Sequence, residues 1–83
     1  MKVDDKILEI LRKAYDDGEY SLDEWAIARI LYPQWDDDGM RSKRGAWIRV
    51  IVQAGWRLYA KGLVGYFFIS HTRMWCTLQS VGK

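Results

Sequence analysis

The stretch GMRSKRGAWIRVIVQAGWRLYAK, residues 39–61, carries the longest uninterrupted helical pattern in the chain and contains no acidic residue. At 3.6 residues per turn, a narrow apolar stripe runs along it, formed by Met40, Trp47, Ile51, Ala54 and Leu58. The opposite side carries Ser42, Ala46, Arg49, Gln53 and Trp56. We therefore expect a helix over residues 40–61 with one buried side and one free side.

The free side has the chemistry to read nucleic acid. Arginine and glutamine side chains can donate the paired hydrogen bonds that base edges accept. Arg41, Lys43 and Arg44 lie at the N-terminal end of the stretch, where DNA phosphates would lie. A core helix with a solvated basic face would show the same pattern, so both interpretations stay open at this point.

Length and composition limit the possible classes of protein. With 83 residues, the chain predicts one domain over residues 1–83, near the lower size at which a core is self-sufficient. The single cysteine, Cys76, excludes an internal disulfide, and with only His71 beside it an ordinary zinc cluster is excluded too. No apolar run is long enough to cross a bilayer, and no signal-peptide pattern opens the chain. We expect a cytoplasmic protein without cofactor or metal.

The charges are divided between the two halves of the chain. All eleven acidic residues lie in residues 1–38, which carry a net charge of −6, whereas residues 39–83 contain no acid and carry +8. Such a division is typical of a protein that turns one face to a polyanion. It also fits internal neutralisation, in which the acidic half packs against the basic half.

Two further helices are predicted before residue 39. Apolar residues at helical spacing follow Asp4 or Asp5 as N-cap and end at Gly18. Ser21 and Glu24 form a capping box that starts a second helix, which Pro33 stops.

Residues 33–39, PQWDDDG, are predicted to form a loop. Its three aspartates do not match a calcium-binding loop, and we expect them to cap the helix that follows.

After residue 62 the pattern changes to that of β-strands. Residues 63–69 and 74–79 are rich in aromatic and β-branched residues, and a short polar stretch separates them. This predicts a hairpin and an α+β fold. The first strand is apolar on both sides, so the pattern leaves open which side faces the core.

Three helices followed by a β-hairpin, with a basic third helix, resemble the winged helix-turn-helix family of DNA-binding domains. The resemblance covers nearly all of the chain and is carried by residues 21–26, SLDEWA, and residues 57–64, RLYAKGLV. It implies a three-helix winged helix-turn-helix with a C-terminal β-hairpin wing, acting as a transcriptional regulator on double-stranded DNA. Carried over, Ser42, Arg49 and Gln53 would face bases, and phosphates would meet Arg41, Lys43 and Arg44, with Arg73 at the tip of the wing. The long acidic segment between helices two and three departs from the family's tight turn.

No catalytic group stands out, since neither His71 nor Cys76 has a partner at suitable spacing, and we expect no enzymatic activity. The alternative function is a protein-interaction module or adaptor on the same fold, as found in small viral and mobile-element proteins. Five large aromatic residues exceed what one small core is expected to hold: Trp35, Trp56, Trp75, Tyr66 and Phe67. Their surplus also predicts a homodimer formed through the hairpin aromatics.

Overall fold

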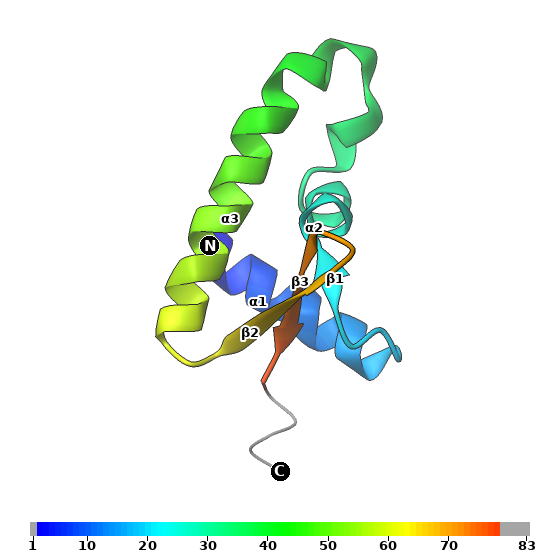
Figure 1. The fold of residues 1–83 in the computed structure, drawn as a ribbon. Helices are drawn as coiled ribbons and strands as arrows, with labels where there is room; N and C mark the ends of the chain where they lie inside the picture. The colour runs from blue at the N-terminus through cyan, green and yellow to red at the C-terminus, as the bar shows by residue number, and fades with distance from the viewer. Residues whose placement is uncertain (1, 79–83) are drawn as a thin grey trace.

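The computed structural model describes residues 2–78. These residues form an α+β fold with three α-helices and one three-stranded antiparallel sheet (Figure 1). In chain order the elements are α1 (Val3–Asp16), β1 (Leu22–Asp23), α2 (Glu24–Leu31), the 3-10 helices η1 (Pro33–Asp36) and η2 (Asp38–Lys43), α3 (Arg44–Ala60), β2 (Val64–Ile69) and β3 (Thr72–Thr77). Within this range no helix is both long and apolar enough to span a lipid bilayer.

Glycines end α1 and α3 in the same way. Gly18 and Gly62 follow the two helices with φ of 95° and 76°, a backbone region that favours glycine. In each case the next amide reaches back into the last helical turn, Glu19 to the carbonyl of Ala14 at 2.8 Å and Leu63 to that of Leu58 at 3.0 Å. The predicted end of the first helix is therefore confirmed. Its predicted N-cap is wrong, because the N-cap is Lys2 and both Asp4 and Asp5 lie in the first turn of α1.

The predicted capping box at Ser21 and Glu24 is wrong. The N-cap of α2 is Asp23, whose carboxylate accepts a hydrogen bond from the amide of Ala26 at 3.1 Å. Leu22 and Asp23 form β1 instead, because they pair with Trp75 and Met74 of β3 across the sheet. This long-range pairing moves the helix start and leaves the Glu24 side chain free for another role.

The third α-helix is shorter than residues 40–61. It begins at Arg44, and residues 33–36 and 38–43 form the two 3-10 helices, where the sequence predicts a loop and the first turn of the helix. Between Gly39 and Gly45 the only large apolar side chain is Met40, so this segment has no apolar stripe with which to pack as an α-helix. The aspartates do not cap α3: Asp36 ends η1, Asp37 precedes η2 without a side-chain capping bond, and Asp38 is its first residue.

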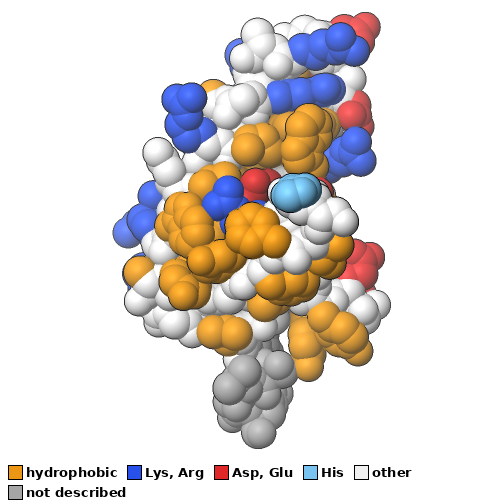
Figure 2. Space-filling view, viewed as in Figure 1, with side chains coloured by type: hydrophobic (Ala, Val, Ile, Leu, Met, Phe, Trp, Pro, Cys, Tyr) orange, Lys and Arg blue, Asp and Glu red, His pale blue; other side chains and the backbone are white. Residues whose placement is uncertain are grey.

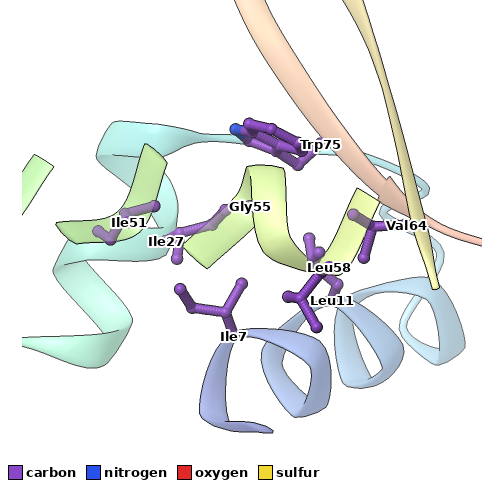
Figure 3. Close-up of a pocket in the computed structure, with 8 residues that line it drawn as sticks. All are labelled: Ile7, Leu11, Ile27, Ile51, Gly55, Leu58, Val64 and Trp75. Atoms are coloured by element: carbon purple, nitrogen blue, oxygen red, sulfur yellow. The ribbon is translucent and has the colours of Figure 1, made fainter. Parts of the chain in front are cut away.

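The core lies where α1, α2 and α3 meet the inner side of the sheet. The residues shown in Figure 3 are Ile7, Leu11, Ile27, Ile51, Gly55, Leu58, Val64 and Trp75, and they leave no space between them for a water molecule. Trp35 and Trp75 are each 1% exposed, so the expectation that they exceed the core is wrong. Trp75 fits because Gly55 has no side chain, and Trp35 fits because η1 folds back over α2 and α3.

The predicted hairpin is confirmed as β2 and β3, but its second strand begins at Thr72 and not at Met74, so that Arg73 belongs to the strand. Leu78 follows the end of β3, and Gln79 lies outside the described residues. Its register pairs Val64 with Thr77 and Ile69 with Thr72. Because β1 also pairs with β3, the sheet order is β1-β3-β2 and β2 is an edge strand. Alternation along β2 then turns Val64, Tyr66 and Phe68 towards the helices, which the sequence pattern had left open.

The hairpin turn consists of Ser70 and His71, whose φ angles are 47° and 69°. Two positive φ angles in a two-residue loop define a type I′ turn, for which Asn-Gly is the preferred sequence.

The double change Ser70→Asn and His71→Gly should therefore raise the free energy of unfolding by about 1 kcal/mol, measured by urea denaturation. Gly62→Ala is the control, because it places a side chain where φ is positive. It should lower the free energy of unfolding by about 1 kcal/mol. An unchanged midpoint for the double variant would show that the turn is not strained.

Candidate nucleic-acid interface

The N-terminal part of α3 and the two 3-10 helices project from the rest of the fold (Figure 1). We call this region, residues 33–53, the projecting end. Its centre is the buried indole of Trp35, whose ring lies 5.2 Å from Trp25 and 6.0 Å from Trp47. Trp47 in turn stacks on Tyr32 at 4.6 Å with an interplanar angle of 9°. This aromatic cluster holds the start of α3 against the end of α2.

Arg44 is part of this support. Its Nε and Nη2 donate to the carbonyl oxygen of Trp35 at 2.9 and 2.6 Å, and its guanidinium lies 5.1 Å from the Trp35 ring centre. Its nearest carboxylate oxygen, on the exposed Asp36, is 3.9 Å away. Because two of its donor groups are already used, Arg44 is placed to order the projecting end and not to contact phosphate.

The other predicted contact residues of this region are free. All five are exposed, and they are Arg41, Ser42, Lys43, Arg49 and Gln53. Within the part of the chain that the structure describes, none of the three cations has a carboxylate within salt-bridge distance. Arg49 and Gln53 lie one turn apart on the exposed side of α3, as the helical spacing predicted, whereas Ser42 lies in η2, outside the α-helix, so that spacing does not apply to it. Gly45 and Ala46, between Ser42 and Arg49, are exposed as well.

The C-terminal part of α3 is neutralised by α1. Nε and Nη2 of Arg57 donate to the two carboxylate oxygens of Asp4 at 2.9 and 2.6 Å. This hydrogen bonding holds the pKa of Asp4 below its ordinary value and raises that of Arg57. Of the arginines of α3, Arg49 is therefore the one without a salt bridge in the described residues, and it lies at the projecting end. That end also carries the cations Arg41 and Lys43 and the exposed carboxylates of residues 36–38, while Lys61 is exposed at the other end of α3.

Arg73 does not lie at the tip of the hairpin. It is in β3 opposite Phe68, and its Nε is 2.9 Å from Oε2 of Glu24, both side chains being largely buried. The same oxygen accepts a hydrogen bond from Nε1 of Trp75 at 2.9 Å. The Arg73 guanidinium also lies 5.1 Å from the Trp56 ring centre, so its charge is turned inward. The sequence did not reveal this role of Glu24, because its partners follow about fifty positions later in the chain.

An aromatic surface covers the join between α3 and the hairpin. We use this name for Trp56, Tyr59, Tyr66 and Phe68, which are between 36% and 60% exposed. Tyr66 makes edge-to-face contacts with Trp56 at 4.9 Å and with Tyr59 at 5.2 Å. Figure 2 shows hydrophobic side chains gathered over the middle and lower part of this view, with a Lys or Arg side chain among them, while most Lys and Arg side chains lie along its top and upper margins. Basic and aromatic surfaces are thus separate regions of one molecule.

Other site chemistry is sparse in the described residues. No cluster of three histidine, cysteine or acidic side chains in residues 2–78 has the spacing to hold a metal ion. His71 is exposed in the turn, and Cys76 is a half-buried free thiol. Searches against protein-family models, curated proteins and solved structures found no match to this chain.

Proposed function

We propose that this protein is a small DNA-binding protein of the winged-helix type that regulates transcription in the cytoplasm. The observation that carries the proposal is the distribution of paired and unpaired cations. Arg44, Arg57 and Arg73 are each within salt-bridge distance of an acidic side chain. The free cations Arg41, Lys43 and Arg49 share the projecting end, so internal neutralisation accounts for only part of the basic half.

The order of elements supports this proposal. Helices α1, α2 and α3 precede a β-hairpin, and β1 joins that hairpin from between the first two helices, an arrangement compatible with a winged helix. In that family the third helix enters the major groove. The hairpin here offers no free cation in its described strands, so we assign it no phosphate contact and leave Arg73 out of the proposed interface.

The shape of the free side of α3 also suits a groove. Gly45 and Ala46, between Ser42 and Arg49, are exposed and have no bulky side chain. A Cβ added to Gly45 would meet no atom within 4 Å, so the surface is open there. Arg49 and Gln53 are one helical turn apart, so both side chains can reach the same part of a groove floor. Arg41 and Lys43 flank them where phosphates would lie. The proposed interface is therefore Arg41, Ser42, Lys43, Arg49 and Gln53.

The test is binding to duplex DNA as a function of salt, followed by fluorescence anisotropy. Lys43→Ala should weaken binding to random and selected duplexes alike and reduce the salt slope by about one unit. Arg49→Ala should weaken the binding free energy by about 1–3 kcal/mol on a duplex selected from a random library and change it little on random DNA. Lys13→Ala removes an exposed cation from the C-terminal end of α1 and is the matched control, with no expected effect.

The second candidate function is a protein-interaction module, favoured by the aromatic surface. Exposed tryptophan and tyrosine side chains are enriched at the centres of protein interfaces. The two candidates give different results in the same experiment. If the wild-type protein shows no salt-dependent binding to any duplex even at low ionic strength, DNA binding is excluded and the interaction module takes its place.

A further inference from the structure

The free edge of the sheet is unprotected. Strand β2 is the longer of the two outer strands in the order β1-β3-β2, and its sequence, VGYFFI, contains no charge and no proline. Natural edge strands usually carry lysine, proline or a bulge that prevents another strand from pairing with them. The last four residues of β2 are also 36–60% exposed although they are large and apolar. The edge is therefore suited to pairing with a further strand.

The register identifies the backbone groups that this edge offers. The amide of Leu78 donates to the carbonyl of Leu63 at 3.2 Å, which makes these two residues a hydrogen-bonded pair of the ladder. Because such pairs alternate along antiparallel strands, Gly65, Phe67 and Ile69 also turn their amides and carbonyls towards β3. The backbone groups of Val64, Tyr66 and Phe68 then point away from the sheet. Among residues 2–78 no backbone group outside the sheet bonds to them.

We propose that β2 of a second copy of this chain pairs antiparallel with this edge, about a two-fold axis at Tyr66. In an antiparallel pair, residues whose backbone groups point towards the partner strand lie opposite residues of the same kind. Two copies of β2 can therefore form hydrogen bonds with each other through their outward amides and carbonyls. With Tyr66 opposite its own copy, Val64 of each chain lies opposite Phe68 of the other. All the outward amides and carbonyls of β2 then find partners, and the two sheets become one continuous sheet.

Side chains in this register are complementary as well. On the outer face Phe67 of one copy lies opposite Gly65 of the other. The aromatic ring can pack over the glycine backbone, which has no side chain of its own to shield it. Leu63 lies opposite Ile69, so the apolar residues that are exposed in one copy meet apolar residues of the next. Since no residue from 62 to 70 is charged, antiparallel pairing of identical strands brings no like charges together. A charged partner strand would find no counter-charge at this edge, which favours a second copy.

This dimer does not depend on DNA binding. The hairpin lies by the C-terminal end of α3, and the proposed DNA interface lies at the opposite end (Figure 1). Loss of DNA binding in Lys43→Ala should therefore leave the oligomeric state unchanged, so the two proposals can fail separately.

Sedimentation velocity of the full chain tests the pairing with two changes at one position. Phe68→Ala keeps the outward amide and should leave a dimer, whereas Phe68→Pro removes that amide without removing a bond to β3. Because the dimer is symmetric, the proline removes one interchain hydrogen bond from each copy, two in all. The dissociation constant of the Phe68→Pro dimer should therefore be roughly tenfold or more above that of the Phe68→Ala dimer. Circular dichroism confirms that both variants are folded. A monomeric wild-type protein at high micromolar concentration, equal effects of the two variants, or irregular aggregates would overturn the proposal.

Cross-linking tests the register, with Cys76→Ser as background. In Tyr66→Cys the two thiols face one another across the axis, about 5.5 Å apart at Cα, and oxidation should give a covalent dimer. In Phe67→Cys the thiols lie two residues out of register, beyond the roughly 7 Å that a disulfide spans. Equal cross-linking at both positions, or cross-linking at position 67 alone, would exclude the axis at Tyr66.

Discussion

Replacing Trp35 with alanine is expected to lower the free energy of unfolding by about 3–5 kcal/mol. The indole is 1% exposed and contacts Trp25 and Trp47, and it supports the guanidinium of Arg44. Alanine leaves a cavity that the 3-10 helices can fill only by giving up their position on α3. Urea denaturation followed by circular dichroism measures the loss. For a domain of this size, such a loss is a large fraction of total stability.

Two further variants make this experiment interpretable. Trp25→Ala is the matched control, because that ring is 52% exposed, and about 1 kcal/mol or less should be lost. Trp35→Phe keeps an aromatic ring and should remain folded with an intermediate stability if the alanine variant unfolds. A Trp35→Ala variant as stable as Trp25→Ala would contradict the role of Trp35 as the centre of the projecting end, and would agree with a surplus, exposed tryptophan.

Replacing Gly55 with alanine is expected to destabilise the core by about 1–3 kcal/mol. The added Cβ would lie 2.7 Å from two carbons of the Trp75 ring, Cη2 and Cζ2. Figure 3 shows the Trp75 ring lying against the turn of α3 that contains Gly55. The ring cannot easily retreat, since its Nε1 is bonded to Glu24 and its outer side contacts Trp56 at 5.2 Å. Urea denaturation should show an earlier midpoint.

Gly45→Ala is the control on the same helix. No atom lies within 4 Å of the Cβ that it adds, so only the helix propensity of the residue changes. Alanine is favoured over glycine in helices, and the free energy of unfolding should rise by up to about 1 kcal/mol. The same added methyl group thus has opposite effects ten residues apart. Equal signs for the two variants would show that Trp75 does not pack closely on Gly55.

Much of the fold could be predicted from the sequence because it depends on local patterns. Helical periodicity indicates α1, α2 and most of α3, glycine marks the end of α1, and the change to strand-like residues after Gly62 predicts the hairpin. Strand β1 could not be predicted in this way. A strand of two residues has no period of its own, and Leu22 and Asp23 are extended because they pair with residues about fifty positions away.

The candidate site was predictable to a similar degree. Helical spacing identifies Arg49 and Gln53 as free, because exposure on a helix follows from its period. Arg44 and Arg73 have the same chemistry in the sequence, yet their guanidinium groups are held by Trp35 and Glu24. No local pattern distinguishes a free arginine from a paired one, since the partner is supplied by another element.

The sequence by itself thus determined the order and type of the main elements, the division of charge and the free side of α3. Tertiary structure decided which tryptophans fill the core, which arginines are paired and which side of β2 faces the helices. The physical reason is that period and chain ends are local properties, whereas burial and pairing depend on residues that folding brings together. Trp75 shows this most clearly: its place requires a glycine on α3, a carboxylate at the start of α2 and a partner in β1.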